Sequence, residues 1–175
     1  MIRIPIGVVL LFSSLISQAQ IETMEYYSTG QMRAWGLLQD DKKTGEWISF
    51  YPTGKKSAIE SFDQGILHGI VIYYYPTEVE QGRENWQYGH LQDSVWYFHP
   101  SGAIHRKGMY ENSRYANRWI HYFENGIMER VVTYQGGQPN GATEVYNSEG
   151  VLIQQGEYRN SLEHGTWKFY SGTGT

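Results

Sequence analysis

Histidine and carboxylate side chains are the groups in this chain that could carry out catalysis or hold a metal ion. The sequence contains 18 acidic residues and six histidines, and it contains no cysteine. The histidines are His68, His90, His99, His105, His121 and His164. The HExxH motif, the glycine-rich phosphate loop and the GxSxG elbow are absent from the sequence. Without cysteine there is also no disulfide, thiol nucleophile or cysteine-based zinc site.

The spacing of these residues does not assemble a recognisable catalytic site. His68 and His164 occupy the same position of a sequence repeat, four copies apart, which corresponds to roughly 40 Å along a regular sheet. The carboxylates do not recur as the facing pair that glycoside hydrolysis needs. Among them are Glu46, Glu60, Glu84, Glu144 and Glu157. The sequence therefore predicts no enzyme, no catalytic residue, no metal site and no cofactor; a hydrolase assembled from distant residues is the alternative.

A repeat of 24 residues determines where these side chains lie. One column of the repeat holds Gly45, Gly69, Asp93, Asn117, Gly141 and Gly165. A second column holds Gly30, Gly54, Glu78, Gly102, Gly126, Gly150 and Gly174. A fixed period of this length indicates a repeat architecture. The predicted copies begin near residues 45, 69, 93, 117, 141 and 165, after a partial copy at 21–44, in a single domain that spans residues 20–175.

One copy of the repeat has the composition of two strands and two turns. Residues 46–51 and 55–62 are rich in bulky side chains that favour strands. Pro52-Thr53-Gly54 and Asp63-Gln64-Gly65 are turn sequences. Two strands and two turns make a β-hairpin, and a single hairpin is stable only against its neighbours. We therefore predict an all-β fold, an elongated, open-ended antiparallel meander of stacked β-hairpins.

The repeated glycines and aromatic residues have structural explanations. Glycine readily adopts a positive φ, and the glycines predicted to be turn residues are Gly30, Gly54, Gly102, Gly126 and Gly150. Asp93 and Asn117, in the other column, also tolerate a positive φ better than most residues. The aromatic columns that contain Phe50 and Phe62 are expected to form ladders in the core between neighbouring hairpins.

The N-terminus matches the pattern of a secretory signal. Arg3 precedes an apolar run from Ile4 to Ile16, and Ser17-Gln18-Ala19 offers small residues for cleavage. We predict a signal peptide at 1–19 and an exported protein, periplasmic or extracellular, with no membrane-spanning segment in the mature chain. Removal of Arg3 leaves 13 basic and 18 acidic residues and a net charge of −5. Nucleic acid is therefore not an expected partner.

The repeats resemble those of MORN-repeat proteins, in particular the variant bacterial MORN class. The segments that carry the resemblance are His68-Gly69, Asn140-Gly141, His164-Gly165, Gly45-Glu46-Trp47 and Gly165-Thr166-Trp167. The resemblance covers residues 26–174, and Asp93, Asn117 and Glu78 depart from the glycine pattern. It implies a stack of antiparallel β-hairpins that serves binding or scaffolding.

Some relatives in the variant class are labelled as antitoxins of toxin–antitoxin pairs. This label implies an antitoxin-like binding partner as an alternative role. A second, looser resemblance relates Trp119–Met128 to the aromatic hairpins of choline-binding cell-wall repeats, which hold a quaternary ammonium group in an aromatic cage.

The expected function is that of an exported, non-enzymatic scaffold for protein–protein interaction, with a cell-envelope glycan or other ligand as the alternative partner. Repeat proteins present extended surfaces, and specificity resides in the positions that vary between copies. The predicted partner-binding residues are Trp47, Tyr51, Tyr75, Trp119 and Phe123. The structural alternative is that these side chains pack within the sheet.

Overall fold

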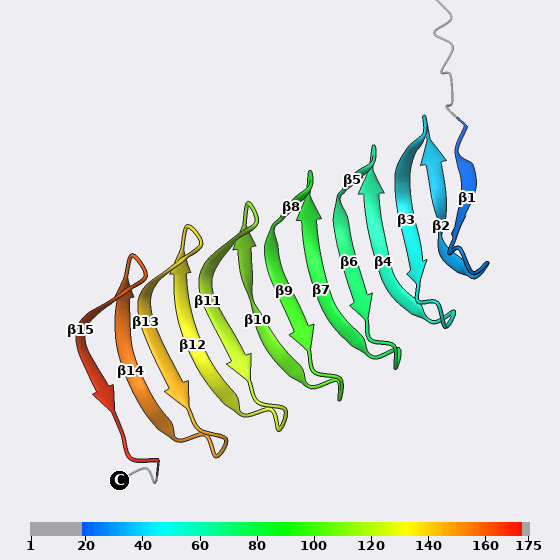
Figure 1. Cartoon of the computed structure of the whole chain (residues 1–175). Coiled ribbons are helices and arrows are strands. Elements are labelled where there is room, and N and C mark those ends of the chain that lie inside the picture. Colours follow the sequence, from blue (N-terminus) through cyan, green and yellow to red (C-terminus); the bar gives the residue numbers. More distant parts are fainter. Residues whose placement is uncertain (1–18, 173–175) are drawn as a thin grey trace, which may run out of the picture.

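The computed structural model describes residues 19–172, so the predicted signal peptide lies outside the described residues except for Ala19. These residues form one antiparallel sheet in which strands that follow one another in the chain are also neighbours in space. Figure 1 shows the strands in a single row with β1 and β15 at opposite ends. The sheet does not close, and the predicted all-β meander is confirmed. The described residues include no helix long and apolar enough to cross a membrane.

The strands of the described region have the following bounds. They are β1 (Ile21–Tyr26), β2 (Met32–Gln39), β3 (Lys42–Phe50), β4 (Lys56–Asp63), β5 (Ile66–Leu67), β6 (Gly69–Tyr74), β7 (Glu80–Gln87), β8 (His90–Leu91), β9 (Asp93–Phe98), β10 (Ile104–Glu111), β11 (Arg114–Tyr122), β12 (Met128–Gln135), β13 (Gln138–Tyr146), β14 (Leu152–Arg159) and β15 (Leu162–Phe169). The two short strands β5 and β8 pair with β4 and β7 and lead into β6 and β9.

A long turn joins the two strands of each hairpin. After β3, the Tyr51 N–H donates to the Lys55 carbonyl and the Gly54 N–H donates to the Tyr51 carbonyl, both at 2.8 Å. Gly54 has a φ of 83°, and the equivalent glycines have φ between 82° and 90°. Glu78 occupies this position in one copy and also has a positive φ, 70°. The backbone therefore requires the left-handed region at this column, which explains the preference for glycine.

A short turn joins each hairpin to the next. Between β4 and β5 it consists of Gln64 and Gly65, with φ of 51° and 84°. Two consecutive positive φ values are typical of the type I′ turn, whose twist matches that of the strands it connects.

In β3, β11, β13 and β15 the residue of the Gly45 column lies within the strand, at a β-bulge, rather than just before the strand as the predicted bounds implied, whereas Gly69 and Asp93 begin β6 and β9. The pairing of β2 with β3 shifts register between Trp35 and Leu37. Gly45 there has a φ of 65°, and Asp93 and Asn117 have 61° and 57° in their own copies. The positive φ expected for these two substitutions is therefore present. A bulge changes the direction of the side chains that follow it, and here it turns Trp47 into the sheet.

The most deeply buried side chains form one column of the repeat. Those with no exposed surface are Trp47, Val71, Val95 and Trp119. By contrast, interior members of the two aromatic columns, such as Phe50 and Phe62, are only partly buried, and none of them is among the buried core residues of the described region. The expectation that the two aromatic columns form the core is therefore corrected. In a sheet of a single layer, a side chain is fully covered only where side chains of the neighbouring strands enclose it. The column of Trp47, which follows the bulge, provides these fully covered side chains.

The two faces of the sheet carry different rows of paired residues. We name them the Trp47 face and the Ile48 face, because adjacent side chains of a strand point to opposite sides. The row across the Ile48 face is Trp35, Ile48, Ile59, Ile72, Arg83, Trp96, Lys107, Ile120, Val131, Glu144, Gln155 and Lys168. The row across the Trp47 face is Ala34, Ser49, Ala58, Tyr73, Gly82, Tyr97, Arg106, His121, Arg130, Val145, Gln154 and Phe169.

Candidate binding faces

Trp47 and Trp119, two of the predicted partner-binding residues, lie in the interior of the sheet. Both side chains are 0% exposed. The Trp47 Nε1–H donates to the Leu37 carbonyl and the Trp119 Nε1–H to the Met109 carbonyl, each at 3.0 Å. The hypothesis that these indoles contact a partner is corrected, because the bulge directs them onto the neighbouring strand instead of toward solvent.

Tyr51, Tyr75 and Phe123 each occupy the first position of a long turn. The Tyr51 hydroxyl donates to the Tyr74 carbonyl at 2.6 Å, and the Tyr75 hydroxyl donates to the Phe98 carbonyl at 2.9 Å. Each bond joins one hairpin to the next, so these tyrosines hold neighbouring copies together. Phe123 lacks the hydroxyl, and in its copy Asn125 Nδ2 donates to the Ser148 carbonyl at 3.0 Å.

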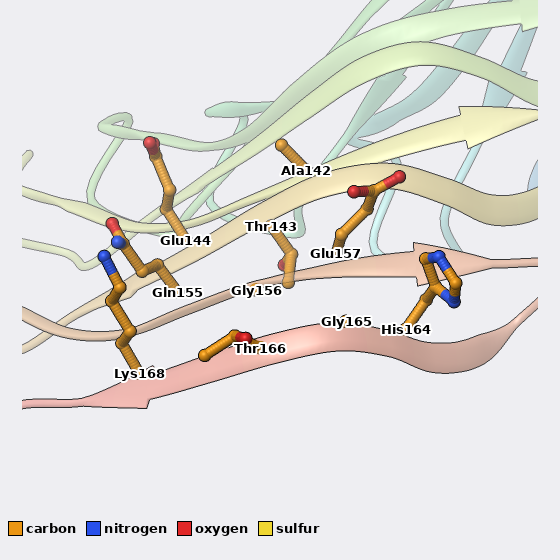
Figure 2. A pocket seen from close by; sticks show the side chains of 10 residues that line it. All are labelled: Ala142, Thr143, Glu144, Gln155, Gly156, Glu157, His164, Gly165, Thr166 and Lys168. Atoms are coloured by element: carbon orange, nitrogen blue, oxygen red, sulfur yellow. The ribbon is translucent and has the colours of Figure 1, made fainter.

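A hollow recurs on the Ile48 face at the same position of the repeat. The first hollow has a volume of about 340 Å³ and lies across β13, β14 and β15. Figure 2 shows Glu144, Gln155 and Lys168 together at one end of it, with Glu157 and His164 toward the other. The second has a volume of about 180 Å³ and lies two copies earlier, across β9, β10 and β11.

The two hollows are formed by equivalent backbone positions of the repeat, but the side chains that line them differ. The wall residues Glu144 and Lys168 of the first hollow are replaced by Trp96 and Ile120 in the second. Likewise, Gln155, Glu157 and Thr166 of the first hollow are replaced by Lys107, Met109 and Arg118 in the second. The first hollow is therefore polar with charges of both signs, whereas the second combines apolar surface with two basic groups.

Trp96 is the most prominent side chain of the second hollow. It is 36% exposed, and it also lines a neighbouring hollow of about 310 Å³ together with Glu80, Arg83 and Phe98. Arg83 is paired with Glu80 at 3.0 Å. Within residues 19–172, neither Lys107 nor Arg118 forms an ion pair with a carboxylate. Trp96 thus stands between two hollows, next to two cationic groups that have no counter-ion.

Sequence reasoning did not identify Trp96. Its column contains Ile48, Ile72, Trp96, Ile120, Glu144 and Lys168, so the variation between copies was visible. The missing information was the bulge, because without it the exposed and buried columns of the strand could not be told apart.

The centre of the Trp47 face is occupied by a buried carboxylate with several donors. Glu84 is 8% exposed, and it accepts hydrogen bonds from the Tyr97 hydroxyl at 2.6 Å and from Trp86 Nε1 at 3.0 Å. Burial and the Glu84 carboxylate raise the pKa of both Tyr97 and Tyr73 far above its usual value. These hydroxyls therefore stay protonated, and the cluster joins the three strands β6, β7 and β9.

The histidines of the described region do not form a metal site. No three histidine, aspartate or glutamate side chains among residues 19–172 are placed to hold a metal ion. His99 lies next to His105, with ring centroids 4.5 Å apart, and His105 lies 6.4 Å from His121. His68 is elsewhere in the sheet and contacts Tyr88.

Comparison with known families gives a match to part of the chain. Residues 43–64 match the MORN repeat variant family, and this segment spans most of β3, the long turn and β4. The same hairpin recurs along the sheet, which is consistent with several copies of this repeat. The chain thus contains a MORN repeat module. A comparison with curated proteins gives no match.

Proposed function

We propose that the protein is an exported, non-enzymatic scaffold of the variant MORN class that binds a partner protein through its Ile48 face. The observation that carries the proposal is the position of Trp96, which is exposed between two hollows and stands beside Lys107 and Arg118, two cationic groups that form no ion pair within residues 19–172. Tryptophan and arginine are the residues most enriched among those that dominate the affinity of protein interfaces.

The chemistry of the face indicates the kind of partner. Four apolar residues begin the row across this face, at Trp35, Ile48, Ile59 and Ile72. Lys107 and Ile120 follow directly beside Trp96. A partner surface with an apolar patch next to acidic side chains would complement this order, because charge complementarity fixes register and speeds association. The polar hollow at Glu144 and Lys168 would then lie at the rim.

The experiment is affinity capture from the cell envelope with the tagged chain, followed by mass spectrometry. We expect Trp96→Ala to lower recovery of the partner at least about tenfold, since loss of a dominant interface tryptophan costs 2 kcal/mol or more. Tyr88→Ala is the matched control, because Tyr88 is 69% exposed and lies in a short turn. Recovery that is equal for both variants would overturn the proposal.

Two further outcomes identify the alternatives. A purified chain that binds a cell-wall glycan, and captures no protein, would replace the protein partner with a glycan. A chain that fractionates with the cytoplasm and captures a toxin would place it with the antitoxin-labelled relatives instead of among exported scaffolds.

A further inference from the structure

Three basic side chains follow one another on three consecutive strands of the Trp47 face. Arg106 of β10 pairs with His121 of β11, which pairs with Arg130 of β12. Neighbouring strands are ~4.8 Å apart, so the three groups share a patch only two strand spacings wide. The equivalent positions of the two arginines in earlier copies are Ala34, Ala58 and Gly82. The repeat itself therefore does not require a cation here.

The guanidinium of Arg106 is held in place but lacks an acceptor. It lies over the ring of Tyr97 at 4.4 Å and 5.8 Å from the ring of Trp119. Its Nε is buried and has no hydrogen-bond partner in the part of the chain that the structure describes. Among residues 19–172, neither Arg106 nor Arg130 forms an ion pair. A buried donor without an acceptor lowers the stability of the folded protein. The Nε–H of Arg106 is therefore available to donate a hydrogen bond to a ligand.

Burial, followed by nearby positive charge, disfavours the charged form of the two neighbouring histidines. His121 is 9% exposed. Its burial, together with Arg130, Arg106 and His105, lowers its pKa to about 4. Burial, His99 and Arg106 also lower the pKa of His105, while the carboxylate of Glu129 acts in the opposite direction and Arg130 adds to the lowering. The single opposing carboxylate does not cancel the field of two arginines.

We propose that Arg106, His121 and Arg130 form a binding site for an oxyanion, either a carboxylate or a phosphate group. A guanidinium presents its N–H groups in a fork that matches the two oxygens of such a group. The contact of Arg106 with the ring of Tyr97 restrains the guanidinium before the ligand arrives. The site lies on the Trp47 face, opposite the proposed partner surface, so neither proposal depends on the other.

The test is an NMR titration of the histidine rings in the full mature chain. The probes are inorganic phosphate and acetate, each added at constant ionic strength. A bound anion would favour the charged imidazole, so we expect the pKa of His121 to rise by roughly one unit or more. A response to phosphate alone or to acetate alone identifies the oxyanion, and both responses support the site.

Two charge-matched variants separate binding from a general effect of charge. Arg106→Gln should abolish the anion-dependent shift of His121. Arg118→Gln removes the same charge from the other face, and it should leave the anion-dependent shift intact. The proposal is overturned if neither anion moves the His121 resonance in the wild-type chain, or if Arg118→Gln abolishes the shift as completely as Arg106→Gln does. The wild-type titration decides the matter even if Arg106→Gln fails to fold.

Discussion

Trp119 covers the backbone of Gly108 on the neighbouring strand so closely that no side chain fits there. A Cβ at position 108 would lie less than 3.0 Å from three atoms of the indole. The pairs Gly36 with Trp47 and Gly156 with Trp167 have the same relationship. Wherever the column of Trp47 holds a tryptophan, the neighbouring strand therefore has a glycine opposite the indole.

We predict that Gly108→Ala destabilises the protein, because the added methyl group collides with the ring of Trp119. Overpacking of this kind costs about 1–3 kcal/mol. The measurement is the free energy of unfolding from urea titration. Gly172→Ala is the control, because the nearest atom to a Cβ there is Asn147 Nδ2 at 3.8 Å. The two variants should not have equal stability.

A double-mutant cycle attributes the cost of Gly108→Ala to the indole. In the Trp119→Val background, Gly108→Ala should cost much less, because the smaller side chain leaves room for a methyl group. Contacting residues commonly show interaction energies of roughly 0.5–3 kcal/mol. Additive effects of the two substitutions would mean that the glycine serves the backbone rather than the tryptophan.

We predict that Tyr51→Phe destabilises the stack without changing the fold. The variant loses the hydrogen bond from the hydroxyl to the Tyr74 carbonyl of the next hairpin, which is 2.6 Å long. The expected loss in the free energy of unfolding is about 1 kcal/mol. Tyr88→Phe serves as the control because that side chain is 69% exposed. A loss no larger than that of the control would contradict the role of Tyr51 between copies.

We predict that stability falls as the pH drops below about 6.5, the ordinary pKa of histidine. The folded protein holds His121 with a pKa lowered to about 4, so the unfolded chain binds the proton first. No stability is lost through His121 while the pH is above its pKa in the unfolded chain. Stability is then lost progressively as the pH falls toward the pKa of His121 in the folded protein. The shift in the pKa of His121 from 6.5 to about 4 corresponds to a loss of about 3 kcal/mol.

Urea unfolding at a series of pH values measures this dependence. His121→Asn should flatten the curve of stability against pH, whereas His90→Asn, at an exposed position in a two-residue strand, should leave it steep. A curve that His121→Asn does not change would show that other groups cause the loss.

We predict that deletion of Asn117–Asn140, one full period, leaves a shorter folded β-sheet protein. The deletion joins equivalent positions of two copies, so the strands stack in the same register. Deletion of Lys55–Asp63 removes about one strand and reverses the direction of those that follow. Circular dichroism and unfolding cooperativity would distinguish the two, and equal damage would count against the hairpin stack.

The period of the repeat was sufficient to predict the hairpins and the turns, because glycine at Gly54 and the Gln64-Gly65 pair have few conformational alternatives. It was not sufficient to predict which face is buried. That depends on the bulge at Gly45, which follows from pairing with a neighbouring strand and not from local propensity. For this reason the sequence placed Trp47 and Trp119 on the surface and overlooked Trp96.

The central claim, that the Ile48 face binds a partner protein, is tested most directly by photo-crosslinking in living cells. A photoreactive phenylalanine would replace Ile120, which lies beside Lys107 on the Ile48 face, and in a separate chain Gln154, on the Trp47 face. The account predicts a specific adduct with one protein from position 120 and none from position 154. An adduct from position 154 alone, or the same adduct from both positions, would contradict it.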